Sequence, residues 1–285
     1  MNDEIRSFKN EKMLFSTGMV GFIAGLFCMS YYFYQGSSIV PPEGDIFKAV
    51  SFNFAIGLFA LTTAFLMPFV NFSKVKGNLF RFSVFLTFVI AIFLETFQNI
   101  RGVDPRFSAS TESFDQILGS VFGLDAMLII LTYLFFTWQV FRPSTLFFSS
   151  NMVLGIRYGM LSTLVSFAAG IWISELSSRY TGEDGNIIWL HGLGFHGVQL
   201  IPIMAWLLGK SRIHNQKSLI HVTGLLWLIV NLSVGIQTYV GKSIFELSPV
   251  MSTGYIASIL CFILISYVLF HVLLDKKGAD FKKMV

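Results

Sequence analysis

Eight long apolar segments dominate the sequence and limit what this chain can fold into. They cover about residues 14–34, 48–70, 80–100, 116–140, 151–174, 187–208, 218–240 and 250–273. Each provides about 20 residues, the length that an α-helix needs to cross a hydrocarbon core of about 30 Å. The sequence therefore predicts an all-α, polytopic helix bundle with eight transmembrane helices, forming one transmembrane domain in a lipid bilayer.

Composition supports the bilayer as the solvent. Charged residues make up 13% of the 285 residues and hydrophobic residues 54%, whereas soluble domains carry about 25% charged residues. This balance excludes an ordinary soluble enzyme, a disordered chain and a nucleic-acid partner, although the isoelectric point is near 9.0. Cys28 and Cys261 both lie in apolar segments, which excludes a disulfide scaffold.

The basic residues predict the orientation of the chain. Only five of the 20 Lys and Arg residues fall on one side of the predicted membrane: Lys48, Arg101, Arg106, Arg179 and Lys242. The other fifteen fall on the side of both termini, and such an excess marks the cytoplasmic side. We therefore expect a multi-pass protein of the plasma (cell) membrane with both termini cytoplasmic. The fifteen are Arg6, Lys9, Lys12, Lys74, Lys76, Arg81, Arg142, Arg157, Lys210, Arg212, Lys217, Lys276, Lys277, Lys282 and Lys283.

Two spacings suggest a repeat of four plus four spans in the same orientation. Pro68 and Pro202 lie near the inner ends of the second and sixth spans. The third and seventh spans each finish with a Gln four residues before a Gly, in the ranges 98–102 and 237–241. Parallel repeats of this kind occur in transporters. Prolines and outer glutamines are also common in unrelated membrane helices, so both interpretations stay open at this stage.

The few polar residues within the first four spans are the first candidate site residues, because an ionisable group at membrane depth is costly and usually functional. Glu95, Gln98 and Arg101 follow one another at a spacing of three and share a helix face. Asp125 lies near the middle of the fourth span. An outward-facing cavity would extend from Glu95 and Arg101 towards the middle of the membrane at Asp125 and at His196 of the sixth span. Glu95 and Arg101 could instead form an ion pair that only holds the outer loop.

The sixth span contributes the other candidates. His196 lies at a depth similar to that of Asp125, Gln199 shares its helix face, and His191 lies nearer the outer end. Asp125 and His196 would then be coupled groups that carry a proton or contact a ligand, or a pair that only ties helices together. The first hypothesis is a transporter or permease for a small polar or ionic ligand, with Arg101 favouring an anion or zwitterion.

Two other classes remain. A membrane-embedded enzyme or redox protein could bind a metal through His191, His196 and Glu95, although the two histidines lie about 140° apart around a regular helix. A haem could be held by His221 and His271, which lie at similar depth near the inner ends of neighbouring spans. The third class is a non-catalytic membrane subunit whose buried polar groups fix helix packing.

Overall fold

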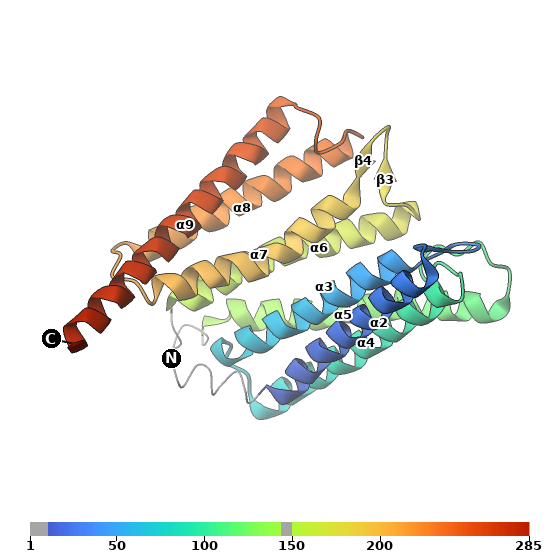
Figure 1. Cartoon of the computed structure of the whole chain (residues 1–285), viewed down its shortest axis with the longest axis horizontal. Helices are drawn as coiled ribbons and strands as arrows, with labels where there is room; N and C mark the ends of the chain where they lie inside the picture. Colours follow the sequence, from blue (N-terminus) through green and yellow to red (C-terminus); the bar gives the residue numbers. More distant parts are fainter. Residues whose placement is uncertain (1–10, 144–149, 285) are drawn as a thin grey trace. The chain divides into compact units, whose positions relative to one another are not determined.

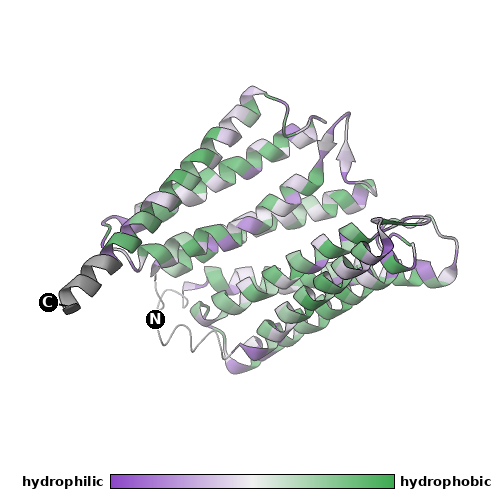
Figure 2. Cartoon of the chain, in the orientation of Figure 1, coloured by the Kyte–Doolittle hydropathy of each residue, from purple (hydrophilic) through white to green (hydrophobic). Residues whose placement is uncertain are grey.

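The computed structural model describes residues 11–143 and 150–284, and these residues form the predicted all-α structure (Figure 1). Eight of the described helices are long and apolar enough to cross a membrane. Hydrophobic residues cover most of their length, and hydrophilic residues gather at helix ends and connections (Figure 2). The helices are α2 (Lys12–Gln35), α3 (Ile46–Leu66, followed by the 3-10 helix η1, Met67–Phe69), α4 (Lys74–Ile100), α5 (Ser113–Phe141), α6 (Ser150–Leu176), α7 (Ile187–Leu208), α8 (Gln216–Tyr239) and α9 (Pro249–Met284).

This arrangement fits a multi-pass integral membrane protein. The cytoplasmic location of the termini stays a prediction, and Arg6 and Lys9, on which it partly depends, lie outside the described residues. The side chains of Lys276, Lys277, Lys282 and Lys283 also lie outside the described part.

The chain divides into two compact units, unit 1 (Met1–Gln139) and unit 2 (Val140–Val285). Within each unit the described elements follow the same order: a long helix, a two-stranded hairpin, and three further long helices. The hairpin of unit 1 pairs β1 (Ile39–Val40) with β2 (Gly44–Asp45), and that of unit 2 pairs β3 (Tyr180–Thr181) with β4 (Gly185–Asn186), both antiparallel. The hydropathy pattern did not predict these hairpins.

In each unit the first two long helices approach closely through small residues. A Cβ added to Gly21 of α2 would lie 2.7 Å from the Cα of Gly57 in α3. In unit 2, a Cβ on Gly159 of α6 would lie 2.7 Å from the Cα of Val198 in α7. Small residues allow the backbones of membrane helices to pack at this range. Gly194 and Gly197 of α7 belong to the same seam, where added Cβ atoms would meet serine side chains of α6.

The hairpins place the next helix in the same way in both units. The Asp45 side chain accepts a hydrogen bond from the Phe47 amide at 3.0 Å at the start of α3. The Asn186 side chain accepts one from the Ile188 amide at 3.1 Å at the start of α7. Both caps have extended backbone, as N-cap residues do.

A glycine turn then joins the third helix of each unit to the hairpin. Gly102 and Gly241 both have positive φ, 81° and 77°, a conformation that glycine adopts readily. The carbonyl of Gly102 accepts from the Glu43 amide at 2.9 Å, and that of Gly241 accepts from the Asp184 amide at 2.9 Å. These glycines are the ones that follow Gln98 and Gln237 in the predicted repeat. The two prolines do not correspond, because Pro68 lies in η1 and Pro202 inside α7.

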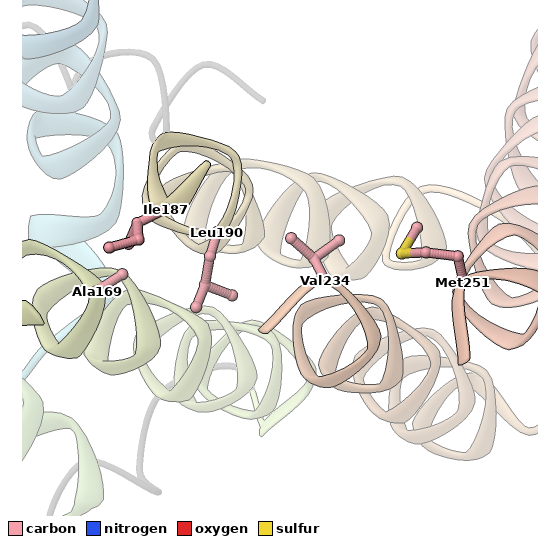
Figure 3. Packing of buried hydrophobic residues seen from close by; sticks show 5 residues of the cluster. All are labelled: Ala169, Ile187, Leu190, Val234 and Met251. Carbon is pink, nitrogen blue, oxygen red and sulfur yellow. The ribbon is translucent and has the colours of Figure 1, made fainter. Parts of the chain in front are cut away.

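The cores of the two units differ in composition. In unit 1, aromatic rings join α5 to α3 and α4: Tyr133 stacks on Phe59 with centroids 4.5 Å apart, and Phe80 stacks on Phe136 at 5.0 Å. In unit 2, an apolar cluster draws residues from α6, α7, α8 and α9 (Figure 3). Its buried members are Ala169, Ile187, Leu190, Val234 and Met251.

Candidate functional site

Three ion pairs of unit 1 lie at the end formed by β1, β2 and the α4–α5 connection (residues 101–112), here called the hairpin end. Nη1 of Arg101 donates to Oδ1 of Asp115 at 2.6 Å and to the Gln98 side chain at 2.7 Å. Ser110 donates to the other Asp115 oxygen at 2.9 Å. Gln98 and Arg101, expected to share a helix face, are therefore brought together with a carboxylate from the next helix.

Glu95 has a different partner from the one considered in the sequence. Its carboxylate is fully buried and lies 2.7 Å from Nη2 of Arg106, not against Arg101. The Asn99 side chain donates to the same carboxylate at 3.3 Å. Arg106 is a site residue that the sequence did not predict, because it lies in the connection after α4 and not on a helix face with Glu95. The arrangement neutralises a carboxylate that would be costly to bury alone.

Each of these two arginines has two phenylalanine rings within cation–π distance. The Arg106 guanidinium lies 5.1 Å from the Phe52 centroid and 5.0 Å from that of Phe122. The Arg101 guanidinium is held in the same manner, 5.3 Å from Phe97 and 5.0 Å from Phe114. Cation–π contacts with two rings restrain a guanidinium, while its nitrogens stay able to form hydrogen bonds.

A third ion pair anchors the connection itself. Nζ of Lys48 lies 3.1 Å from Asp104, whose other oxygen accepts from the amides of Arg106 and Phe107 at 2.9 and 3.0 Å. Burial of Asp104 acts to raise the pKa of its carboxyl. The amide donors and the Lys48 ammonium outweigh that effect, so the pKa of Asp104 lies below its usual value.

Asp125 lies deeper in unit 1, about 15 Å along α5 from Asp115. Its residue is 4% exposed, and Oδ1 has no hydrogen-bond partner among the described residues. Asp125 follows Phe122 by three residues, so it shares the helix face that contacts Arg106. Two turns further along α5, the Tyr133 hydroxyl forms a 2.6 Å hydrogen bond with Thr63. Buried polar groups thus recur along one face of α5.

A groove of about 440 Å³ lies along the same half of α5 but on another face of the helix. It is lined by Ser113, Gln116, Ile117, Ser120, Val121 and Leu124. None of the sequence candidates lines this groove, so the cavity expected from Glu95 and Arg101 towards Asp125 stays a prediction.

The candidates of unit 2 lie on α7. Nδ1 of His196 is 2.7 Å from Oε1 of Gln199, so these two residues contact each other as their spacing indicates. His191 points its ring nitrogen at the Ser166 carbonyl of α6, 2.8 Å away. Asp125 belongs to unit 1 and His196 to unit 2, and their coupling stays a prediction.

The residues considered for cofactors have other contacts. Nδ1 of His221 lies 2.9 Å from the Tyr158 hydroxyl, and Nδ1 of His271 lies 3.0 Å from the Tyr267 carbonyl. Within the described ranges, no three His, Cys, Asp or Glu side chains come together as a set of metal ligands.

The hairpin end of unit 1 combines two oriented guanidiniums, three carboxylates and a buried carboxylate deeper in the same unit. Such a set can bind an anion, exchange ion-pair partners or hold a proton. No protein-family model, curated protein or solved structure matches the chain.

Proposed function

We propose that the chain is a transporter or permease of the plasma membrane, with both termini cytoplasmic, for a small polar or ionic solute. Asp125 carries the proposal, because it is buried within a membrane-length helix and its Oδ1 has no partner among the described residues. An ionised carboxylate in such a place is costly unless it binds a proton, a cation or a ligand group. A side chain that must bind something there suits a transport site.

The hairpin end of unit 1 supports the same function as an entrance. Glu95, Gln98 and Arg101 form its gate, with Arg106 added from the connection. Ion pairs close to the water interface can open and re-form when a charged solute passes, whereas Oδ1 of the deeper Asp125 has no partner among the described residues. Within unit 2, His191, His196 and Gln199 are proposed as solute- or proton-binding groups of α7.

Solute-dependent proton movement tests this proposal directly. Purified protein is placed in liposomes that contain pyranine, a pH-sensitive dye, and inorganic phosphate, lactate or glycine is added outside. We expect at least one solute to change the internal pH with wild-type protein, and Asp125→Asn to abolish the change. Asp125→Glu, which keeps the carboxyl group, should retain part of it. Glu175→Gln is the matched control, because Glu175 is an exposed carboxylate at the end of α6.

Two results would overturn the proposal. Wild-type protein could show no solute-dependent pH change with any of the three solutes, or Asp125→Asn could transport as well as wild type. A second candidate, a non-catalytic membrane subunit, is favoured by the ion pairing of Glu95, Asp104 and Asp115. It would be supported if Asp125→Asn and Asp125→Glu both fail to fold.

A further inference from the structure

The two units can be matched residue by residue through their shared turns. Asp45 and Asn186 cap equivalent helices 141 positions apart, and Gly102 and Gly241 form equivalent turns 139 positions apart. The last helix of each unit has three buried residues at the same separations, ten and then eleven positions. They are Asp115, Asp125 and Phe136 in α5, and Met251, Cys261 and Val272 in α9. These matches give a unit 2 counterpart for most residues of the hairpin end of unit 1.

The counterparts of the buried carboxylates are apolar. Glu95 matches Val234, and Asp115 matches Met251. Both counterparts belong to the apolar cluster of Figure 3, where they pack with Leu190 and Ile187. Arg101 matches Val240, which is exposed.

Unit 2 nevertheless builds the same turn. The Gln237 amide donates to the carbonyls of Ser243 and Glu246 at 3.0 and 3.1 Å, and its oxygen accepts from Ser248 at 2.7 Å. In unit 1 the matching Gln98 instead contacts Arg101 and Asp115. A glutamine and backbone hydrogen bonds are therefore enough to close this turn, so the fold of a unit does not require the Arg101–Asp115 or Glu95–Arg106 pairs.

The connection that carries these charges is also longer than the turn requires. It comprises twelve residues in unit 1 (101–112) and nine in unit 2 (240–248). Arg106 lies within this longer connection. The extra length brings the Arg106 guanidinium to the buried Glu95 carboxylate. The described residues of unit 2 form no such ion pair with a buried carboxylate.

Arg101 has free capacity to bind a ligand. Only its Nη1 makes hydrogen bonds within the described residues, while Nε and Nη2 have none, and its side chain is 30% exposed. Phe97 and Phe114 hold the guanidinium plane. An oriented guanidinium with an open edge matches the two oxygens of a carboxylate or phosphate group.

We propose that the two units are copies of one four-helix fold, and that Arg101 forms a binding site for a small carboxylate or phosphate anion, added to the first copy. This site deepens the proposed transport function and rests on it for its role as the solute entrance. The anion binds the open edge of Arg101 through Nε and Nη2, while Nη1 keeps its hydrogen bonds to Gln98 and Asp115.

Anion binding to purified protein in detergent tests the proposal. The probes are sodium acetate, sodium phosphate and dihexanoyl phosphatidylglycerol, each titrated by calorimetry at constant ionic strength against sodium chloride. The first two probes report a free anion and the third a lipid headgroup. We expect saturable binding of acetate or phosphate to wild type, weakened roughly tenfold or more in Arg101→Gln, because charge-assisted hydrogen bonds are lost. Arg101→Lys should bind more weakly than wild type, because an ammonium lacks the planar fork.

The counterpart variant separates binding from folding. Arg101→Val with Asp115→Met installs the unit 2 residues at both positions, and we expect it to unfold at nearly the wild-type temperature while binding no anion. Lys242→Gln is the matched control. Lys242 is an exposed cation in the equivalent connection of unit 2, paired with Glu246, and its loss should leave binding unchanged.

Several results would overturn the anion site. Wild-type protein could bind neither acetate nor phosphate, or could bind only the lipid probe. Wild type and Arg101→Gln could bind the anion equally well. The counterpart variant could fail to fold at temperatures at which wild type is folded. Failure of transport is a separate outcome. Anion binding at Arg101 without any solute-dependent pH change in liposomes would leave this site standing and remove the transport proposal. Asp125-dependent transport without anion binding at Arg101 would leave the transport proposal standing and remove the anion site.

Discussion

Gly102 and Gly241 occupy equivalent turns of the two units, each with positive φ and each accepting a hydrogen bond from the amide of an acidic residue in the preceding hairpin. The turn therefore depends on backbone geometry that both units share, whatever side chains surround it. The glycine turn is a feature that both units need to fold, whereas the Arg101–Asp115 and Glu95–Arg106 ion pairs near it belong to unit 1 alone.

Alanine at either glycine should destabilise the protein. A Cβ at Gly102 would lie 2.0 Å from the Pro41 carbonyl oxygen, and one at Gly241 would lie 2.6 Å from the Cα of Gly182. The left-handed backbone alone costs about 1–2 kcal/mol for a residue with a Cβ. We expect Gly102→Ala and Gly241→Ala each to lower the unfolding temperature clearly in detergent. Gly192→Ala is the control, because nothing lies within 4 Å of its added Cβ. Equal stability of all three variants would contradict the importance of the turn.

The seam between α6 and α7 should depend on Ser162. Its hydroxyl donates to the Gly194 carbonyl at 2.7 Å and accepts from the Asn231 side chain at 2.8 Å. Ser162→Ala removes both contacts, and we expect a loss of about 1–2 kcal/mol in the free energy of unfolding, measured by titration with a denaturing detergent. Ser174→Ala should have little effect, since Ser174 contacts only a carbonyl of its own helix. A Ser162→Ala variant as stable as Ser174→Ala would show that the contacts contribute nothing.

Asp104 should make the protein sensitive to acid. The pKa of Asp104 in the folded protein lies below its usual value, because amide donors and Lys48 together outweigh burial. Folding therefore favours the ionised form. The resulting stabilisation is complete above the ordinary aspartate pKa of about 3.9 and is lost as the pH falls through the lower, folded value. We expect the unfolding temperature of wild type to fall more between pH 5 and pH 3 than that of Asp104→Asn. Parallel curves for the two proteins would contradict this role.

Labelling from the two sides of the membrane tests the predicted orientation. Glu183 lies in the connection between β3 and β4, and His214 lies between α7 and α8, and both are exposed. With both termini cytoplasmic, a membrane-impermeant maleimide added to intact cells should label Glu183→Cys but not His214→Cys. After permeabilisation both should react. The native Cys28 and Cys261 are buried and should give little background. The opposite pattern would reverse the orientation.

The sequence predicted the helices well, because membrane-length hydropathy is a local signal. The predicted span 187–208 coincides with α7, and the other spans differ mainly at their ends, as when α9 continues beyond residue 273. The hairpins were missed because each strand has only two residues and no apolar run marks it. The Gly-Glu-Asp-Gly stretch at 182–185 was the available turn signal.

The candidate site was harder to predict, because its contacts depend on how a connection folds back. Spacing on one helix correctly grouped Gln98 with Arg101, and His196 with Gln199. No spacing on α4 could show that Arg106, eleven residues after Glu95, would return to cover its carboxylate. Helix periodicity predicts neighbours along one element, whereas such an ion pair is a tertiary contact.

The twelve-residue connection of unit 1 has a consequence for how the protein could have changed over time. If the two units descend from a duplication, the shorter connection of unit 2 is enough to keep a unit folded. Unit 1 could then gain charged residues in its connection and at the ends of its helices and still fold. Descendants of the same duplication should therefore keep both glycine turns, and should keep the charges of residues 101–112 only where they also keep the anion site.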